Sequence, residues 1–117
     1  MQFEAANFGN AQPIDGYGPG FFRVGSTVYD GSVLILPDGI SSWGGYDDTA
    51  PLLALSGKVD VLFIGTGAEI SHIPKDLRVA LETANIGVEP MATPSACRTY
   101  NVVLAEGRRI AAALFAV

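Results

Sequence analysis

The hydrophobic and polar residues of this chain form strand-like and helix-like patterns that alternate through its second half. Residues 59–64 contain the run Val-Leu-Phe-Ile, which has no polar face and is typical of a strand covered on both sides. After Pro74, the residues Leu77, Leu81 and Ala84 recur at the i, i+4, i+7 spacing of one helix face. The pattern therefore predicts a buried strand followed by an amphipathic helix.

The same alternation continues to the end of the chain. Gly87 is placed to end the first helix, and a short strand is expected over residues 88–91. Thr93-Pro94 reads as an N-cap and N1 pair, and Gly107 is placed to end the helix that follows. The inward stripe of that helix consists of Ala96, Tyr100, Val103 and Leu104. With a final strand over residues 110–117, the order α-β-α-β-α-β indicates right-handed crossovers and a largely parallel sheet.

The N-terminal half is predicted to open with a β-hairpin. Residues 21–29 and 32–36 are rich in β-branched and aromatic residues, and the Asp30-Gly31 pair between them is a strong two-residue turn signal. The glycine-rich segments 14–22 and 37–48 are expected to be loops. Further along, Thr49 resembles the N-cap of a short helix over residues 52–56, which Gly57 would end.

Length and composition place the chain among small globular proteins. We expect its 117 residues to form one α/β domain, because a chain of this length can bury one real core. The single cysteine, Cys97, excludes an intrachain disulfide and a cysteine-rich metal site. The N-terminus shows no signal or transit peptide and the apolar runs are strand-sized, so no membrane span and a cytoplasmic location are expected.

The charge of the chain is unevenly distributed. Seven Lys and Arg against twelve Asp and Glu give a formal net charge of −5. Residues 1–56 hold one base, Arg23, against six acids, whereas residues 57–117 hold six of each sign. No basic stripe follows any predicted element, which argues against nucleic-acid binding. The acidic half is interpreted first as a solubility feature and second as a docking surface.

Gly65-Thr66-Gly67 is the segment most suggestive of a ligand site. It follows a buried strand, where glycines allow a backbone to approach a phosphate at a helix N-terminus. The dinucleotide fingerprint is incomplete, because Ile70 stands where its third glycine would fall. A structural turn is the favoured interpretation, and a loop that binds a small anion is the alternative.

Few other residues suggest chemistry. His72, the only histidine, lies in an apolar loop and is interpreted as a satisfied structural residue rather than a catalytic base. Cys97 lies in the first turns of the Thr93 helix, where burial is favoured over a thiol activated by the helix dipole. No cofactor, metal site or catalytic set is predicted.

Tyr100 and Asn101 are of more interest. Tyr100 lies on the inward stripe, so its hydroxyl would need a partner. Asn101 is a poor helix former, and we expect its amide either to bind a neighbouring loop backbone or to line a pocket with the glycine turn. Glu106, Arg108 and Arg109 are expected to form a solvated turn at the end of the helix.

Several of these segments together resemble a known family. The strand ending in IGTG, the segment MATPSACRTYNVVLAEGRRIAAAL, the segment PIDGYGPGFFRV and the strand ending at Leu36-Pro37 closely resemble the Mth-type domain-of-unknown-function family. That family includes the mitochondrial complex I assembly factor 3 and the adipogenesis-associated Mth-domain protein. The resemblance implies a three-layer α/β domain with a mixed, mostly parallel sheet. For the mitochondrial member it implies a non-catalytic assembly factor that works through a partner protein. The ending ALFAV suggests that this chain is a bacterial member, and no catalytic residues come with the family.

Three functional hypotheses follow. The first is a non-enzymatic protein-binding domain that assists the assembly of a larger complex, with an exposed Phe22 beside Tyr17 as a contact site. The second is a small-anion or metabolite site at the glycine turn. The third is a homo-oligomer, since 49% of the residues are hydrophobic. The candidate ligand or partner residues are Gly65, Thr66, Gly67, Thr93, Tyr100, Asn101, Tyr17 and Phe22.

Overall fold

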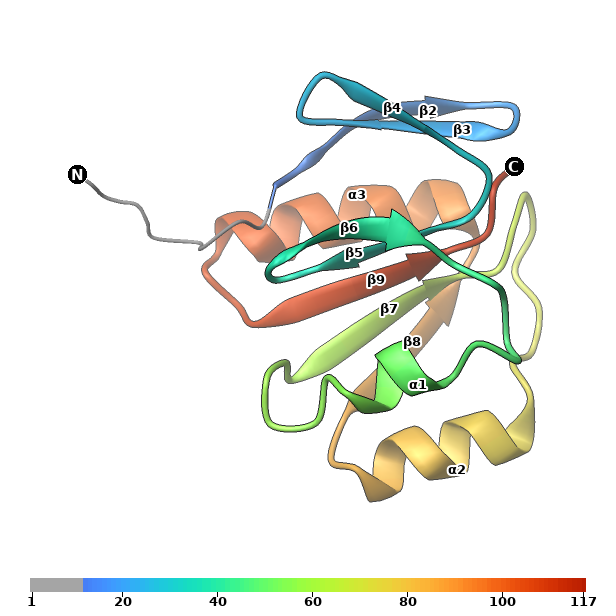
Figure 1. Ribbon diagram of the computed structural model, residues 1–117, viewed down its shortest axis with the longest axis vertical. Helices are drawn as coiled ribbons and strands as arrows, with labels where there is room; N and C mark the ends of the chain where they lie inside the picture. The colour runs from blue at the N-terminus through green and yellow to red at the C-terminus, as the bar shows by residue number, and fades with distance from the viewer. Residues whose placement is uncertain (1–11) are drawn as a thin grey trace.

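A mixed five-stranded sheet forms the centre of the molecule. The computed structural model describes residues 12–117, and its main sheet has the strand order β6-β5-β9-β7-β8 (Figure 1). Its strands are β5 (Val33–Leu36), β6 (Gly39–Ser42), β7 (Val61–Gly65), β8 (Gly87–Met91) and β9 (Ile110–Leu114). Strand β7 pairs in parallel with β8 and β9, whereas β5 pairs antiparallel with β6 and β9. The predicted mixed α/β architecture is confirmed. The sheet is not mostly parallel as predicted, because two of its four strand pairings are parallel and two are antiparallel.

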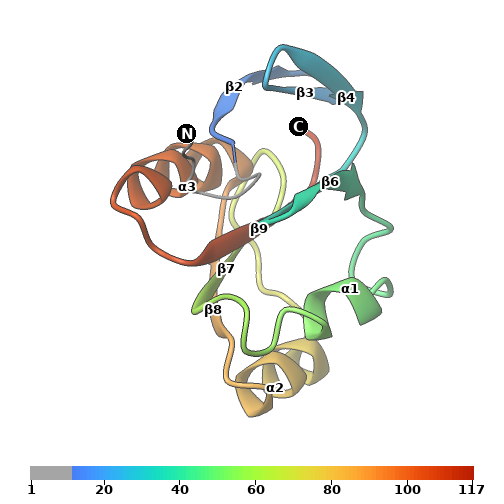
Figure 2. The ribbon, with the colours of Figure 1, turned by 60° about the vertical axis from the view of Figure 1, so that its left-hand side comes forward.

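Helices cover both faces of this sheet and complete three layers. The helices are α1 (Ala50–Leu53), α2 (Lys75–Thr83) and α3 (Thr93–Ala105). Figure 2 shows α2 and α3 on opposite sides of the sheet. Strand β9 serves both layers, because Ile110, Ala112 and Leu114 belong to the core beneath α3. The intervening Ala111 and Ala113 belong to the core on the other face, beneath α1 and α2. This alternation is the period of two expected of a strand.

A second, smaller sheet packs on the α3 side. It is an antiparallel meander of β2 (Ile14–Gly18), β3 (Phe21–Val24) and β4 (Thr27–Asp30). Phe22 and Val24 of its middle strand are buried in the same core cluster as Tyr100 of α3. The C-terminus lies beside this sheet, where the Gly20 N–H donates to the Val117 carbonyl at 2.9 Å.

The predicted hairpin at Asp30-Gly31 is wrong. Strands β4 and β5, which flank this pair, belong to different sheets, so Asp30-Gly31 is the crossing between the sheets. The hairpin turn lies instead at Gly25-Ser26, inside the predicted strand 21–29, where φ is +59° and +71°. Positive φ at both central positions is the geometry of a tight type I′-like turn. Gly-Ser is itself a hairpin turn pair, but here it lies inside a run rich in β-branched and aromatic residues, which favours one continuous strand.

Two segments predicted to be loops contain strands. Residues 14–22 contain β2, and residues 37–48 contain β6. Both strands lie at the edge of a sheet, and both are rich in glycine and serine, which have low β propensity. Pairing with a neighbouring strand, rather than intrinsic preference, therefore decides their conformation.

The helices were predicted with small errors at their ends. Helix α1 was predicted over residues 52–56. It begins two residues earlier, at Ala50, and ends three residues earlier, at Leu53. The Thr49 side chain makes no capping hydrogen bond. Helix α2 ends at Thr83 with Ala84 as its C-cap, and Asn85 then takes φ of +63°. Gly87, predicted to end this helix, is the first residue of β8. After glycine, asparagine is the residue type that best tolerates this left-handed conformation, so Asn85 takes the role expected of a glycine.

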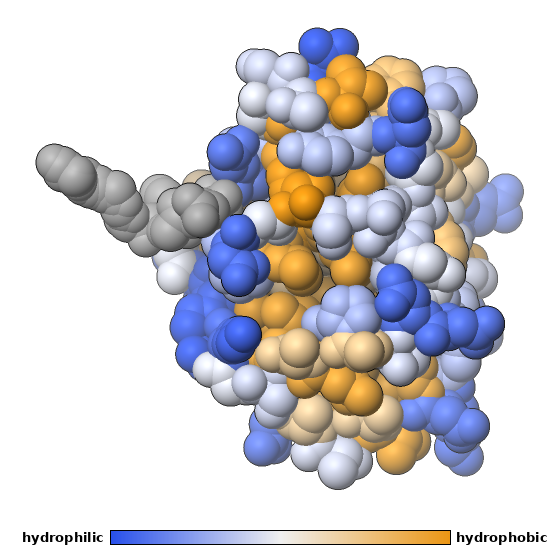
Figure 3. Space-filling model, in the orientation of Figure 1, coloured by the Kyte–Doolittle hydropathy of each residue, from blue (hydrophilic) through white to orange (hydrophobic). Residues whose placement is uncertain are grey.

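Figure 3 shows hydrophobic residues gathered along the middle of one face, with hydrophilic residues at its borders. This face carries β6 and α1, the shortest helix, in the orientation of Figure 1. A groove of about 530 Å³ opens there between the β5–β6 turn and α1. It is lined by Leu36, Pro37, Asp38, Pro51, Ala54, Leu55 and Lys58. Leu36, at the end of β5, is the residue of the main sheet that lines this groove, and it is half-buried.

Candidate functional site

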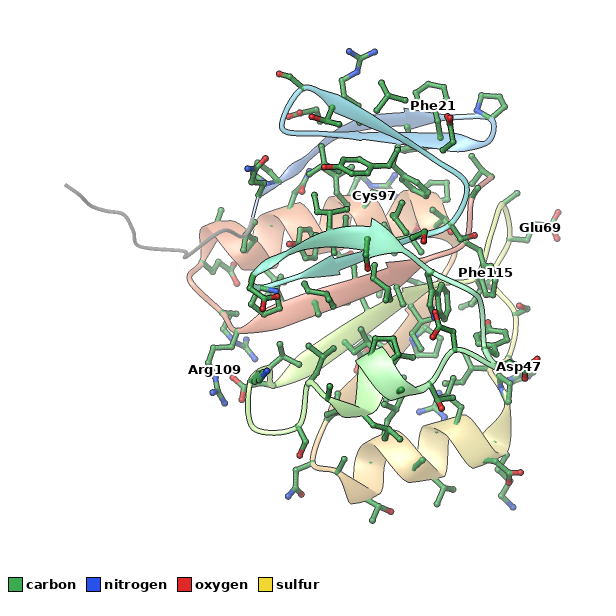
Figure 4. All side chains as sticks on the ribbon, in the orientation of Figure 1. Phe21, Asp47, Glu69, Cys97, Arg109 and Phe115 are labelled. Carbon is green, nitrogen blue, oxygen red and sulfur yellow. The ribbon has the colours of Figure 1, made fainter. Side chains whose placement is uncertain are left out.

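Thr93 ties the glycine turn to the end of β9. Its backbone N–H donates to the Gly67 carbonyl at 2.7 Å, and its hydroxyl accepts the Gly67 N–H at 2.9 Å. The same hydroxyl donates to the Phe115 carbonyl at 2.8 Å. Thr93 is fully buried, so this hydroxyl joins three chain segments inside the fold (Figure 4 shows Phe115). Thr93 was predicted to be an N-cap, and this is wrong: Ala92 holds the N-cap position, and Thr93 makes no capping bond.

The close approach of α3 explains the first glycine of the turn. A Cβ atom added at Gly65 would lie 2.7 Å from the Thr93 hydroxyl and 2.9 Å from a methyl carbon of Leu114. Gly67 takes φ of +110°, which side chains rarely adopt. The Thr66 hydroxyl donates to the Glu69 carbonyl at 2.7 Å and accepts the Ser71 N–H at 3.1 Å, which closes the following loop. The Gly65-Thr66-Gly67 turn is therefore a packed seam between β7, α3 and β9.

The hydrogen-bond donors needed for an anion are largely engaged. The Gly67 and Thr93 N–H groups bind within the chain, and Pro94 has no N–H. In the first three residues of α3 this leaves only the Ser95 N–H. A helix N-terminus binds anions through several converging N–H groups, and here they do not converge on open space.

Asn101 serves β2 rather than the glycine turn. Its Oδ1 accepts the Ile14 N–H at 2.7 Å, and its Nδ2 donates to the Ile14 carbonyl at 2.8 Å. The amide thereby pairs with one residue as a neighbouring strand would. Asn101 lies eight residues after Thr93, about 12 Å along the helix axis. Of the two interpretations from the sequence, binding to neighbouring backbone is confirmed, and a pocket shared with the glycine turn is wrong.

Tyr100 and Cys97 face the core between α3 and the sheet. Both are buried, and burial raises the pKa of Tyr100 to about 12 and the pKa of Cys97 to about 11. Cys97, labelled in Figure 4, is therefore the inert buried thiol that was predicted. The Tyr100 hydroxyl has no hydrogen-bond partner among residues 12–117. The partner expected from the sequence for this hydroxyl is absent from that part of the chain.

Tyr17 and Phe22 are opposite neighbours in the small sheet, but only one is accessible. Tyr17 is 40% exposed, whereas Phe22 is 0% exposed and packs against the α3 layer. The prediction of an exposed Phe22 is wrong, because its strand turns that side chain inward and leaves the preceding Phe21 half-buried. Phe21 packs its ring against Gly18, directly across the β2–β3 pair (Figure 4).

The polar residues at the ends of β7 are solvated. His72 is exposed, so its interpretation as a satisfied structural residue is wrong. The Arg109 guanidinium lies 2.6 Å from Asp60 and also donates to the Gly57 carbonyl at 3.2 Å, which confirms a solvated arginine turn (Figure 4). The hydrogen bond from the Arg109 guanidinium to the Asp60 carboxylate holds the pKa of Asp60 below its ordinary value. Residues 12–117 contain no group of three His, Cys, Asp or Glu side chains able to hold a metal ion.

Comparison with known proteins assigns the family. Residues 14–115 match the sequence profile of the family described as a protein of unknown function, DUF498/DUF598. The chain belongs to this family. An uncharacterized DUF498/DUF598 relative from Rhodobacter capsulatus is 54% identical over 92% of the chain and 86% of its own length. The resemblance stated from the sequence is thereby confirmed.

More distant relatives carry a functional name. The NADH dehydrogenase (ubiquinone) 1 alpha subcomplex assembly factor 3 of Danio rerio is 32% identical over 86% of this chain. The human protein of that name is 29% identical over 97% of the chain. The chain spans less than two thirds of the length of both, 62% and 64%. These family relatives are thus longer proteins that share this region.

Solved structures agree with the observed fold. A Bartonella henselae protein described as an outer membrane protein aligns with a TM-score of 0.87 at 40% identity, covering 95% of this chain and 99% of its own. A Bordetella pertussis protein described as an Mth938-like domain aligns with a TM-score of 0.75 at 26% identity, covering 99% and 91%. The Mth938-like architecture predicted from the sequence is confirmed.

The structure also shows a feature of this DUF498/DUF598 member that sequence reasoning missed. Strand β6 forms one edge of the main sheet, and its Ser41 and Ser42 are exposed. The only sequence signal for it is Ile40 within a Gly-Ile-Ser-Ser segment, which is too short and polar to predict a strand. The edge strand and the adjoining groove therefore add a surface to the residues considered from sequence alone.

Proposed function

We propose that this chain is a protein-binding factor that assists the assembly of a larger protein complex. The observation that carries the proposal is its relationship, at 32% identity over 86% of the chain, to a protein named as an assembly factor of NADH dehydrogenase. An assembly factor acts by presenting a surface to subunits, and it needs no reacting groups.

The geometry of the predicted candidate site supports this choice. The glycine turn uses its donors within the chain, and the Asn101 amide bonds through both its oxygen and its nitrogen to Ile14. The two buried groups with strongly raised pKa, Cys97 and Tyr100, lie inside the core. The surface features that remain are those a partner protein would contact: an exposed sheet edge, an apolar groove and Tyr17.

The proposed location of the protein is the cytoplasm, and the support is its single, unpaired, buried thiol. No helix of residues 12–117 has the length and apolar character needed to cross a membrane. The Bartonella henselae relative is described as an outer membrane protein, so location requires its own measurement. Fractionation of cells that express the tagged chain should recover it in the soluble cytoplasmic fraction. Recovery with the outer membrane would overturn this part of the proposal.

Affinity capture tests the binding role. The tagged chain is purified from its own cells at moderate salt, and the bound proteins are identified and quantified by mass spectrometry. The proposal predicts a partner in stoichiometric amount. A bait variant with Phe22→Ala serves as the unfolded control, because that residue is fully buried in the α3-side core. Recovery of the wild-type bait without any partner, from soluble and membrane fractions alike, would contradict the proposal.

A further inference from the structure

The outer edge of β6 carries backbone groups that no strand of residues 12–117 uses. The Trp43 N–H donates to the Ser32 carbonyl at 3.0 Å, and these residues lie directly opposite each other in the β5–β6 register. In an antiparallel ladder, every second residue bonds to its neighbour. The backbone N–H and C=O groups of Gly39, Ser41 and Trp43 therefore point toward β5. Ile40 and Ser42 direct their N–H and C=O groups away from the sheet.

The two edges of the main sheet differ in how they are protected. Natural proteins blunt exposed edges with charged residues, proline or bulges. The opposite edge strand, β8, carries Glu89 and Pro90, and its Pro90 offers no N–H. Strand β6 reads Gly-Ile-Ser-Ser, without a charged residue or a proline, and its register with β5 shows no bulge. This edge is therefore suited to accept one more strand, in the mode in which an extended peptide adds to a sheet.

Charge identifies the kind of strand that fits. Between Arg23 and Lys58 the chain has four Asp and no Lys or Arg. One of these, Asp38, is exposed at the β5–β6 turn, before β6 begins. Another, Asp48, lies at the other end of β6, where its carboxylate accepts the Gly44 N–H at 2.9 Å. A strand seated on β6 would thus meet a carboxylate at both ends, which favours basic residues at both of its own ends.

The same charges disfavour a second copy of the chain. In a two-fold antiparallel pairing, Ile40 of one copy would bond with Ser42 of the other. Asp38 would then lie opposite Gly44 of the second copy, beside the Asp48 carboxylate bound there. Two such contacts between like charges would form across one short interface, between chains that each carry a net charge of −5.

The groove beside β6 offers room for an apolar side chain of the added strand. Gly39 lies opposite Leu36, which lines the groove, and a Cβ added at Gly39 would meet no atom within 4 Å. No side chain at Gly39 therefore separates the sheet edge from the groove. Figure 3 shows a strip of hydrophobic residues along this face. Its lining is mainly apolar, with Lys58 and Asp38 among the residues at its walls.

We propose that β6 and the adjoining groove form a docking site for a basic-ended β-strand of a partner protein, which extends the main sheet through the backbone of Ile40 and Ser42. The inference rests on the proposed function and names the class of partner segment. It commits to a strand with Lys or Arg at both ends and an apolar residue that enters the groove.

A binding experiment with purified components tests this directly. The probe is a disulfide-closed hairpin peptide whose outer strand alternates Thr and Val between two Lys residues, since a closed hairpin presents its strand pre-ordered. Binding is measured by NMR titration of the labelled chain at low salt. The expected result is saturable binding, with slowed hydrogen exchange at the Ile40 and Ser42 amides. A hairpin with Glu in place of both Lys should bind at least tenfold more weakly, and added salt should reduce that difference.

Two variants isolate the backbone edge. Ser42→Pro removes the outward N–H, and an edge strand tolerates proline where its N–H faces solvent. It should weaken Lys-hairpin binding about tenfold or more, as expected for one lost buried hydrogen bond. The matched Ser42→Thr variant keeps the N–H and should bind as the wild type does. If Ser42→Pro does not fold, a Lys hairpin methylated at its outer-strand backbone nitrogens gives the same comparison on the wild-type chain.

Four results would overturn the inference. They are no binding of the Lys hairpin, equal binding of the Glu hairpin, full binding by folded Ser42→Pro, and amide protection located away from β6. A dimer in light scattering that Ser42→Pro dissociates would assign the edge to a second copy instead. These outcomes are independent of the affinity capture. A partner captured equally well by Ser42→Pro would refute the β6 site while leaving the proposed function intact.

Discussion

Replacing Thr93 by valine should destabilise the fold although it changes the side-chain volume little. The substitution removes the hydroxyl that accepts the Gly67 N–H at 2.9 Å and donates to the Phe115 carbonyl at 2.8 Å. Each backbone group left without a partner costs about 1–3 kcal/mol. Because both bonds are only partly buried, the lower end applies, and the expected loss is about 2–3 kcal/mol of unfolding free energy.

For a chain of this size, that loss corresponds to a fall in melting temperature of about 10 °C. Urea and thermal unfolding, followed by circular dichroism, measure both quantities. Thr99→Val is the matched control, since Thr99 lies on the same helix and its side chain makes no hydrogen bond with residues 12–117. It should change the unfolding free energy by less than about 0.5 kcal/mol. Thr93→Ser keeps the hydroxyl and should recover most of the loss.

The result that would refute the reasoning is a Thr93→Val variant as stable as Thr99→Val. The hydroxyl would then contribute nothing to the seam between β7, α3 and β9.

Three further outcomes are expected. Asn101→Ala should lower the unfolding free energy by about 2 kcal/mol, because the Ile14 N–H and carbonyl both lose their partner. Hydrogen exchange should show β2 opening first, and unchanged exchange in β2 would contradict this. Arg109→Gln should move the titration of Asp60, followed by NMR, to higher pH, since the hydrogen bond that lowers its pKa is lost. Stability should fall as pH rises from about 9 to about 11, because the Cys97 thiol ionises in the unfolded chain before it does in the folded one. Burial also raises the pKa of Tyr100, which adds to this fall above about pH 10, so Cys97→Ala should reduce the dependence mainly between about pH 9 and 10 in chemical unfolding.

The second half of the fold could be predicted because each element there carries its own signal. Strand β7 is apolar on both faces, and α2 places Leu77 and Leu81 on one side. Strand β9 is predicted as a buried strand, but its sequence Ile-Ala-Ala-Ala-Leu does not reveal which layer each side chain meets. The apolar run of β7 and the one-sided apolar stripe of α2 each indicate the type of element without reference to the rest of the chain.

The first half could not be predicted in the same way. Strands β2 and β6 contain few β-forming residues, and they are strands only because a neighbour pairs with them. The Asp30-Gly31 turn signal is real, but a turn sequence does not state whether the next strand stays in the same sheet. Long-range pairing, which local sequence does not encode, decides these cases.

The candidate site residues show a similar limit. Thr93 followed by Pro94 has the sequence of a helix cap, yet the hydroxyl is used by Gly67 and Phe115 instead. The difference arises because Gly65 lets α3 approach β7 closely enough to bury Thr93. Phe22 was predicted to be exposed because two adjacent phenylalanines in a strand must point to opposite faces, and only the packing of the small sheet decides which one is buried.

Relatives of this chain are named as assembly factors of NADH dehydrogenase, so that enzyme is the complex on which to test the proposed assembly role. The most direct test is its assembled amount in cells that lack this chain. Native gel electrophoresis with an NADH-oxidation stain measures it in the deletion strain, with subunit synthesis measured in parallel. The account predicts a loss of the assembled complex at unchanged subunit synthesis, restored by the wild-type chain and by Ser42→Thr but not by Ser42→Pro. Normal amounts of the assembled complex in the deletion strain would contradict it.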